Sequence, residues 1–140
     1  MELALEARAE NIAIVRHVLG GLGEAYEMPE EKLSDIRLAV TEACANVVVH
    51  AYPDDQTGQM EVIATMEDER LTVLVRDWGC GIRPRPDSPG LGLGLSLIAA
   101  LAESVQLGHG EQEHTEVQMT FALKDPVRTS ALTGTTGQGA

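Results

Sequence analysis

Residues 33–52, LSDIRLAVTEACANVVVHAY, carry the pattern that decides the fold of this chain. Their apolar side chains recur at helical spacing, at Ile36, Val40, Ala43 and Val47. This period predicts one long helix with a single buried stripe along it. The helix should end before Pro53, because proline cannot continue the helical hydrogen-bond ladder. A helix with one apolar face must pack against a second layer, so the remaining elements are interpreted around it.

Glu42 and Asn46 lie one turn apart on this helix, about 100° round from the apolar stripe. Side chains four residues apart are neighbours on a helix, so this carboxylate and this carboxamide are aimed at the same place. Together they can orient a nucleophile and bind a divalent cation through oxygen. A half-exposed polar ridge is the simpler interpretation of the two residues taken alone.

The composition predicts an acidic globular protein with an aliphatic core. The chain has 140 residues, of which 44% are hydrophobic, and a net charge of −12. This size fits one domain. The negative charge argues against binding to nucleic acid or to anionic lipid. Because only 10 Lys and Arg residues are present, a bound phosphate must be held by backbone N–H groups and a metal ion.

The N-terminal segment does not have the character of a signal peptide, because Glu2, Glu6 and Glu10 interrupt it. No apolar run approaches the ~20 residues that a membrane-spanning helix needs. Cys44 and Cys80 do not make a disulfide framework, so we expect two free thiols in a reducing compartment. These features predict a cytoplasmic protein without a membrane partner.

Shorter patterns around the central helix predict the other elements. We expect helices at residues 11–20, where Gly20 and Gly21 act as the stop, and at residues 91–104. Alternating patterns predict strands at residues 2–7, 59–66, 71–78, 105–108 and 115–123. This order predicts an α+β fold, a two-layer sandwich with helices on one face of a mixed, mostly antiparallel sheet. Residues 1–124 should form this single domain, followed by a disordered tail at residues 125–140.

Asp77 ends one of the predicted strands and should face the core. Apolar side chains alternate along that strand, at Leu71, Val73 and Val75. Asp77 continues the same alternation, so it points to the same side as they do. A carboxylate is expensive there unless it has a partner. It can accept a hydrogen bond from an exocyclic amine and so read adenine, or it can cap a backbone N–H at the strand end.

Two glycine-rich segments follow Asp77. Gly79 and Gly81 let the backbone turn sharply against something flat or bulky. Gly90, Gly92 and Gly94 come where the third helix should start, near Leu93. Free N–H groups and the positive end of the helix dipole would make an anion site there. A flexible hinge is the simpler interpretation of these glycines taken alone.

The three motifs together resemble the GHKL ATPase superfamily, which includes histidine kinases, gyrase-type topoisomerases, heat-shock chaperones and mismatch-repair proteins. Residues 42–46 (EACAN) look like its N box, residues 77–81 (DWGCG) like its first glycine box and residues 90–94 (GLGLG) like its second. Within that group, the short chain and residues 41–52 (TEACANVVVHAY) look like the anti-sigma factor serine kinases of bacteria. The similarity covers residues 8–123.

This resemblance implies a two-layer ATP-binding fold that often dimerises and uses ATP with Mg²⁺. It implies that Glu42 activates a substrate serine, that Asn46 binds the nucleotide and Mg²⁺, and that Asp77 reads adenine. The glycine boxes imply further nucleotide contacts, at Gly79, Gly81, Gly90, Gly92, Leu93 and Gly94. Arg16 falls where these kinases carry an arginine that contacts a protein partner.

We therefore predict an ATP-dependent serine/threonine protein kinase that binds a sigma factor and phosphorylates a serine on an anti-sigma antagonist. It would not bind nucleic acid directly. Two alternatives remain open. Only residues 82–89 separate the glycine boxes, where these kinases usually carry a longer lid, so one alternative is a nucleotide-gated binding module that transfers no phosphate. The other is the ATPase domain of a histidine kinase, although no phosphoacceptor helix pair is evident before the central helix.

Overall fold

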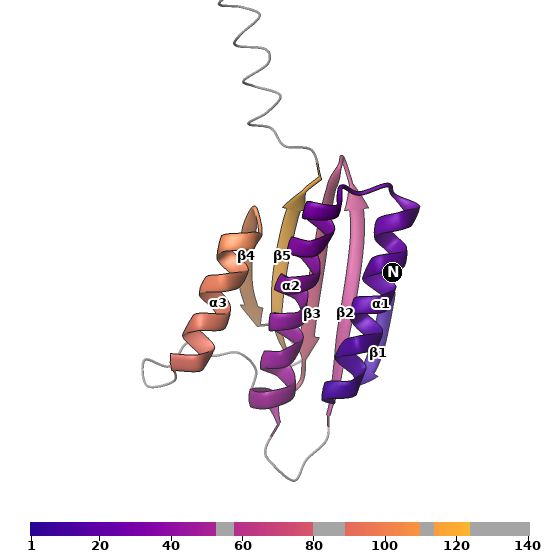
Figure 1. Ribbon diagram of the computed structural model, residues 1–140. Coiled ribbons are helices and arrows are strands. Elements are labelled where there is room, and N and C mark those ends of the chain that lie inside the picture. The colour runs from indigo at the N-terminus through magenta and orange to yellow at the C-terminus, as the bar shows by residue number, and fades with distance from the viewer. Residues whose placement is uncertain (53–57, 80–88, 110–113, 124–140) are drawn as a thin grey trace, which may run out of the picture.

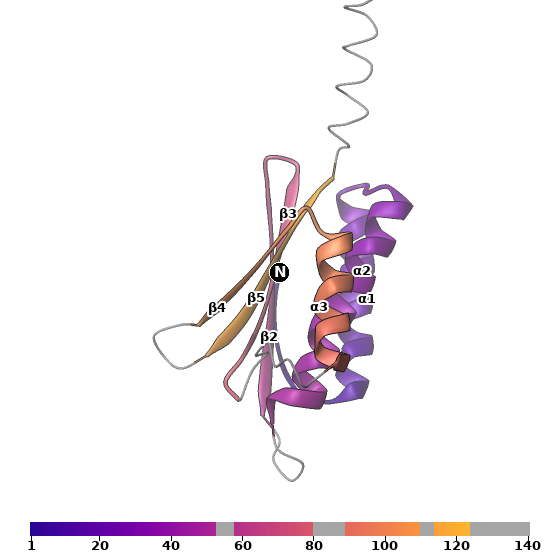
Figure 2. The same cartoon turned by 90° about the vertical axis from the view of Figure 1, so that its left-hand side faces the viewer.

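The computed structural model describes residues 1–52, 58–79, 89–109 and 114–123, with the backbone alone at residues 89–93. In this part of the chain, the helices form one layer and a β-sheet forms the other, as the side view in Figure 2 shows. The predicted two-layer α+β sandwich is therefore confirmed. Cys80, Gly81, residues 82–88 and the predicted tail lie outside the described residues.

The sheet has the strand order β1-β2-β3-β5-β4, and every pairing between its described strands is antiparallel. The strands are β1 (Glu2–Glu6), β2 (Gln59–Glu67), β3 (Arg70–Asp77), β4 (Ser104–His109) and β5 (Thr115–Ala122). Asp68 and Glu69 form the turn between β2 and β3, with φ values of 52° and 61°. Because β3 lies in the centre of the sheet, Asp77 at its end has a neighbouring strand on each side.

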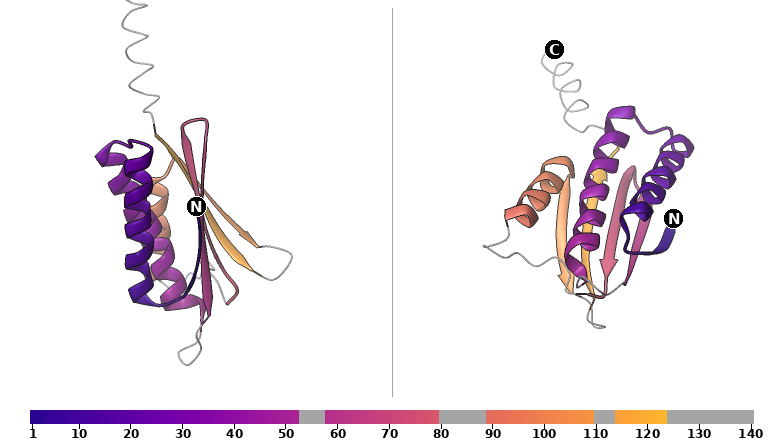
Figure 3. Two further views of the ribbon diagram at one scale, coloured as in Figure 1. Left: turned by 90° about the vertical axis from the view of Figure 1, so that its right-hand side faces the viewer. Right: turned by 60° about the horizontal axis from the view of Figure 1, so that its bottom comes forward.

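The helical layer contains α1 (Ala9–Ala25), α2 (Glu30–Asn46) and α3 (Pro89–Leu101). A π-helical segment, η1 (Val47–Ala51), continues directly from α2. Figure 1 shows α2 between α1 and α3, across the middle of the sheet, and Figure 3 shows from the other edge that the helices cover the same face. No helix among the described residues is long and apolar enough to cross a bilayer.

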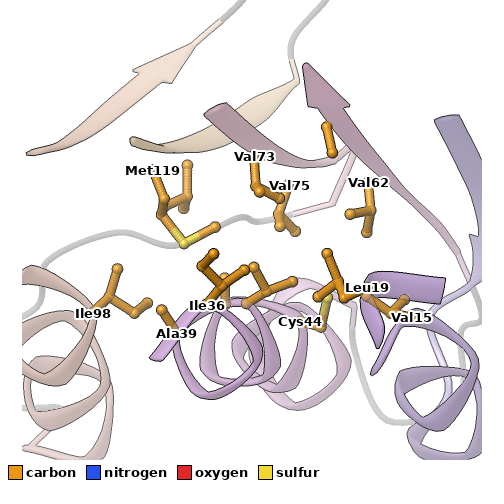
Figure 4. Packing of buried hydrophobic residues seen from close by; sticks show 14 of the residues in the cluster. Val15, Leu19, Ile36, Ala39, Cys44, Val62, Val73, Val75, Ile98 and Met119 are labelled. Carbon is orange, nitrogen blue, oxygen red and sulfur yellow. The ribbon is translucent and has the colours of Figure 1, made fainter. Parts of the chain in front are cut away.

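The buried stripe of α2 anchors this arrangement. The four predicted core residues are at most 1% exposed, namely Ile36, Val40, Ala43 and Val47. Figure 4 shows Ile36 and Ala39 facing Val73 and Met119 of the sheet, with Leu19 of α1 beside them. Fully burying a side chain of this size contributes about 1.5–3 kcal/mol, so the stripe fixes the rotation of α2 about its own axis.

The central helix differs from the prediction at its C-terminal end. It begins at Glu30, directly after Pro29, and Glu30 and Glu31 place negative charge in its first turn. The α-helical hydrogen bonding ends at Asn46, and η1 replaces the predicted last turn. π-helical turns of this kind are rare and often occur at functional sites.

The first helix does not stop at Gly20 and Gly21, because α1 continues to Ala25. A Cβ atom on Gly20 would overlap the guanidinium of Arg37 on α2, and one on Gly23 would lie 2.6 Å from Cδ2 of Leu33. These two glycines let α1 approach α2 closely. This packing outweighs the loss of about 1 kcal/mol that glycine brings to a helix interior.

The third helix also begins earlier than predicted. It starts at Pro89 and ends at Leu101, so the second glycine box occupies its first turns instead of preceding it. Proline is well suited to the first turn, because its ring fixes a helical φ and the N–H that it lacks would have no partner there.

Gly21 differs from its neighbours, because a Cβ atom added to it would meet nothing within 4 Å. Gly21→Ala should therefore raise the free energy of unfolding by about 1 kcal/mol, the usual gain from replacing glycine in an exposed helix interior. The matched variant Gly23→Ala should show no such gain, because its Cβ atom would collide with Leu33. Urea denaturation of the two variants measures the difference, and a destabilised Gly21→Ala protein would contradict this account of α1.

Candidate functional site

Glu42 and Asn46 meet the second glycine box at the contact between α2 and α3. A Cβ atom on Gly94 would lie 3.0 Å from Asn46 Nδ2, 3.4 Å from Asn46 Oδ1 and 3.5 Å from Glu42 Oε2. Residues that are far apart in the sequence are thus in contact, and a side chain at position 94 would crowd Asn46 and touch Glu42. The absence of that side chain lets α3 pack directly against the polar edge of α2.

Asn46 is 7% exposed, and its Nδ2 is buried without a hydrogen-bond partner among the described residues. A buried donor without a partner costs about 1–3 kcal/mol, so this position favours a ligand that brings an acceptor. Glu42 is only half-buried, so its carboxylate can reach a group that enters from solvent. Both residues lie beside the core stripe, as the helical periodicity predicts.

Asp77 is 1% exposed and faces the helical layer, which confirms its predicted orientation. Its Oδ1 accepts a hydrogen bond of 3.0 Å from the backbone N–H of Gly79. The simpler sequence interpretation, a cap at the strand end, is therefore also correct. A carboxylate has about four acceptor positions, so this bond leaves capacity for a ligand. Burial raises the pKa of Asp77, while the Gly79 N–H and the nearby His114 act to lower that pKa.

The close contact of Gly79 with η1 explains the first glycine of this box. A Cβ atom on Gly79 would overlap the carbonyl oxygen of Ala51 and lie 2.9 Å from Cδ1 of Tyr52. The Tyr52 hydroxyl donates to the carbonyl of Gln59 at 2.6 Å and accepts from the N–H of Trp78 at 3.1 Å. The C-terminal end of η1 is thus tied to β2 and to the chain that leaves β3, which keeps Asp77 near that end of η1.

Thr115 is a candidate site residue that the motif analysis missed. It lies directly across from Asp77 in the β3–β5 register and is 5% exposed, while Met60 flanks Asp77 on the other side. The alternation that places Val117 inward extends by one step to Thr115, so the sequence contained the signal. A threonine beside a buried carboxylate adds a hydroxyl that can donate or accept a hydrogen bond.

The remaining predicted site residues lie on α3 and α1. Gly90, Gly92 and Leu93 lie in the first turns of α3. Arg16 is exposed on α1, where its Nη1 donates to Thr41 Oγ1 at 2.9 Å. This contact brings Arg16 to the α2 residue that precedes Glu42.

Cys44 is a buried free thiol. Burial raises the pKa of Cys44 to about 12, so this thiol is not a nucleophile candidate.

Comparison with known proteins identifies the fold and the family. Residues 5–121 match the histidine kinase-like ATPase domain. The chain belongs to that family. Proteins named serine-protein kinase RsbW, from Bacillus mycoides and Bacillus thuringiensis subsp. konkukian, are each 29% identical to it over 126 residues, covering 79% of this chain and 78% of the relative.

Two solved structures share the fold of this ATPase domain. The first contains the RsbU and RsbW domains of a Mycobacterium tuberculosis protein, with a TM-score of 0.68 and 22% identity over 90% of this chain. The second is the histidine kinase domain of a blue-light activated histidine kinase from Erythrobacter litoralis, with a TM-score of 0.56 and 28% identity over 68% of this chain. The chain spans 33% and 46% of those two structures. These matches confirm the predicted GHKL-type fold.

The raised pKa of Asp77 gives a testable dependence of stability on pH. The folded protein holds this proton to a higher pH than the unfolded chain does, so the charge of Asp77 reduces stability once pH rises above about 4. Asp77→Asn keeps an acceptor for the Gly79 N–H and removes the charge. This variant should be more stable than the wild type at pH 7, and the difference should shrink as pH falls toward about 4 and vanish below it.

Glu103→Gln provides the matched control with the opposite sign. A hydrogen bond from Arg70 lowers the pKa of Glu103, so that carboxylate contributes stability at neutral pH and loses it in acid. Thermal unfolding of both variants between pH 3 and pH 8 measures the two trends. A less stable Asp77→Asn protein at pH 7 would mean that the ionised carboxylate stabilises the fold.

Proposed function

We propose that this ATPase domain binds ATP with Mg²⁺ at the junction of α2, η1 and α3 and transfers the γ-phosphoryl group to a serine of a protein partner. The observation that carries the proposal is the contact of Gly94 with Glu42 and Asn46. This contact brings the Glu42 carboxylate, the Asn46 carboxamide and the glycine-rich start of α3 together. The relatives named serine-protein kinase support the reaction.

The adenine end of the site lies at Asp77. A buried carboxylate with spare acceptor capacity suits the exocyclic amine of adenine, which is a donor. Met60 and Thr115 flank Asp77 in the sheet. Met60 offers an apolar side chain, and Thr115 offers a hydroxyl that can form a hydrogen bond with the edge of the adenine ring. When adenine binds at Asp77, the ribose and phosphates of the same nucleotide can extend along the polar edge of α2.

The phosphate end lies at the start of α3. The N–H groups of a helix's first turn have no partners within the helix, and the dipole there favours anions. Asn46 Nδ2, which has no partner among the described residues, suits a phosphate oxygen, and Asn46 Oδ1 suits Mg²⁺. No group of three or more His, Cys, Asp or Glu residues is gathered in the described part of the chain. The ion would therefore take its remaining ligands from phosphate and water.

Glu42 is the proposed general base. When the serine oxygen bonds to the γ-phosphorus and the bond from that phosphorus to the β–γ bridging oxygen breaks, the hydroxyl proton must leave. The half-buried carboxylate of Glu42, next to Asn46, is placed to receive it. Bound Mg²⁺ would neutralise charge on the phosphates. ADP and a phosphoserine are the products.

The partners are proposed from the same resemblance: a sigma factor that the chain binds, and an anti-sigma antagonist that carries the serine. Residues 1–124 are proposed to act as one domain. A nucleotide-gated binding module without phosphoryl transfer is the second candidate. The short sequence between the glycine boxes favours it, because few residues are present to shield the phosphates from water.

Asn46→Ala tests the metal assignment. ATP affinity should fall strongly in Mg²⁺ and much less in EDTA, because the effect of a metal ligand vanishes with its metal. Asp77→Asn is the control within the same site, since its loss of ATP affinity should be similar in both buffers. Isothermal titration calorimetry gives the four affinities. Equal losses for Asn46→Ala with and without Mg²⁺ would assign Asn46 a structural role.

Glu42→Gln distinguishes a kinase from a nucleotide-gated binding module. This variant should bind ATP and its partners normally but transfer phosphate about 10²–10⁴-fold more slowly, the usual contribution of a general base. Glu31→Gln, an exposed carboxyl in the first turn of the same helix, should transfer at the wild-type rate. The assay uses radiolabelled ATP and the antagonist that co-purifies from the native cell.

Two results would decide against the proposed kinase. If the wild type transfers nothing while ATP still changes its affinity for the partner, the protein is a nucleotide-gated module. If Glu42→Gln transfers at the wild-type rate, the base is a different residue.

A further inference from the structure

Two adjoining hollows lie between the end of α1 and the start of α2. Their volumes are about 870 and 440 Å³, and Arg37, Leu33 and Glu30 line both of them. Figure 1 shows that these ends of α1 and α2 meet at the opposite end of the helical layer from η1. Arg37 precedes Asn46 by roughly 14 Å along the helix axis, at about 1.5 Å per residue. The larger hollow is therefore separate from the proposed ATP site.

Arg37 is a half-buried cation that has no ion-pair partner in the part of the chain that the structure describes. Its Nε atom is buried and makes no hydrogen bond, and no carboxylate among the described residues forms an ion pair with its guanidinium. Withdrawing a charge from water without pairing it is costly. The planar fork of a guanidinium matches a carboxylate with two parallel hydrogen bonds. Arg37 thus supplies the hollow with a site for an acidic group.

Gly21 lines the larger hollow with backbone alone, because it has no side chain. Its two neighbours in that wall, Gly20 and Gly23, have side-chain atoms of α2 where a Cβ atom would be, whereas the space beside Gly21 is empty. Packing within the chain therefore does not explain this glycine. A helix backbone without a side chain allows an occupant of the hollow to lie directly against it.

The charges and apolar side chains around Arg37 indicate the chemistry of the occupant. Val18, Leu22 and Met28 line the larger hollow, while Glu24 and Glu27 lie exposed along it. A volume of about 870 Å³ lies within the ~300–1,000 Å³ that is usual for ligand pockets in proteins. The occupant must combine an acidic group for Arg37 with aliphatic side chains for the wall and basic groups for the exposed glutamates.

We infer that this hollow is a docking site for a segment of a partner protein in which an Asp or Glu lies next to aliphatic side chains and is followed or preceded by Lys or Arg. A peptide segment meets all three requirements at once, whereas a small free acid meets the first two and is repelled by Glu24 and Glu27. The inference does not rest on phosphoryl transfer, because the docking needs neither ATP nor Glu42.

The test is selection of a phage-displayed library of random dodecapeptides on the full chain, followed by synthesis of the consensus peptide. The consensus should contain an acidic residue beside Leu, Ile, Val or Met, together with at least one Lys or Arg. Its affinity, measured by fluorescence anisotropy without nucleotide, should fall at least tenfold in Arg37→Gln. Arg70→Gln, which removes an exposed arginine on β3, is the matched control and should bind like the wild type.

Gly21→Ala separates docking from a folding defect. Its melting temperature should rise while its affinity for the peptide falls severalfold, a combination that a loss of structure does not produce. A selection without enrichment, a consensus without acidic residues, or equal binding by the wild type and Arg37→Gln would overturn the inference. A consensus that matches a segment of this chain, with a dimer that Arg37→Gln dissociates in sedimentation, would also overturn it by making a second copy the occupant.

Discussion

The rotation of α2 about its axis is the constraint on which the proposed site depends. The buried stripe from Ile36 to Val47 allows one face of this helix to meet the sheet, and that choice turns Glu42 and Asn46 toward α3. Gly94 then determines how closely α3 can approach, because any side chain there would crowd Asn46. Hydrophobic packing thus sets the direction of the polar groups, and the glycine lets the start of α3 lie directly against them.

The polar groups of the site are costly to the fold. Asn46 buries an amide donor that has no partner in the described part of the chain, and Asp77 buries a carboxylate whose pKa is raised by burial. A buried donor without a partner costs about 1–3 kcal/mol, which the aliphatic core must offset. The π-helical η1 is a further departure from regular structure, placed directly after Asn46 and against Gly79. A ligand that supplies an acceptor to Asn46 and a donor to Asp77 would recover part of this energy.

Periodicity predicted the elements and the buried sides of the chain, because burial is recorded in the spacing of apolar residues. The stripe of α2 and the inward orientation of Asp77 followed from it. The spacing could not predict that α1 passes through Gly20 and Gly23, since the reason is contact with Arg37 and Leu33 on another helix. The π-helical turn at Val47 depends likewise on tertiary packing. The alternation along β5 indicates that Thr115 is buried, but its position opposite Asp77 is known only from the strand pairing, so it was missed as a site residue.

The most direct test of the central claim, that Asp77 reads adenine at this junction, is to compare the affinities for ATP and for inosine triphosphate. Inosine carries a carbonyl oxygen where adenine carries the exocyclic amine, so a carboxylate loses its hydrogen bond and faces another acceptor. The wild type should bind ATP at least tenfold more tightly, about 1.4 kcal/mol, and Asp77→Asn should lose most of this preference. Equal affinities of the wild type for the two nucleotides would contradict the account.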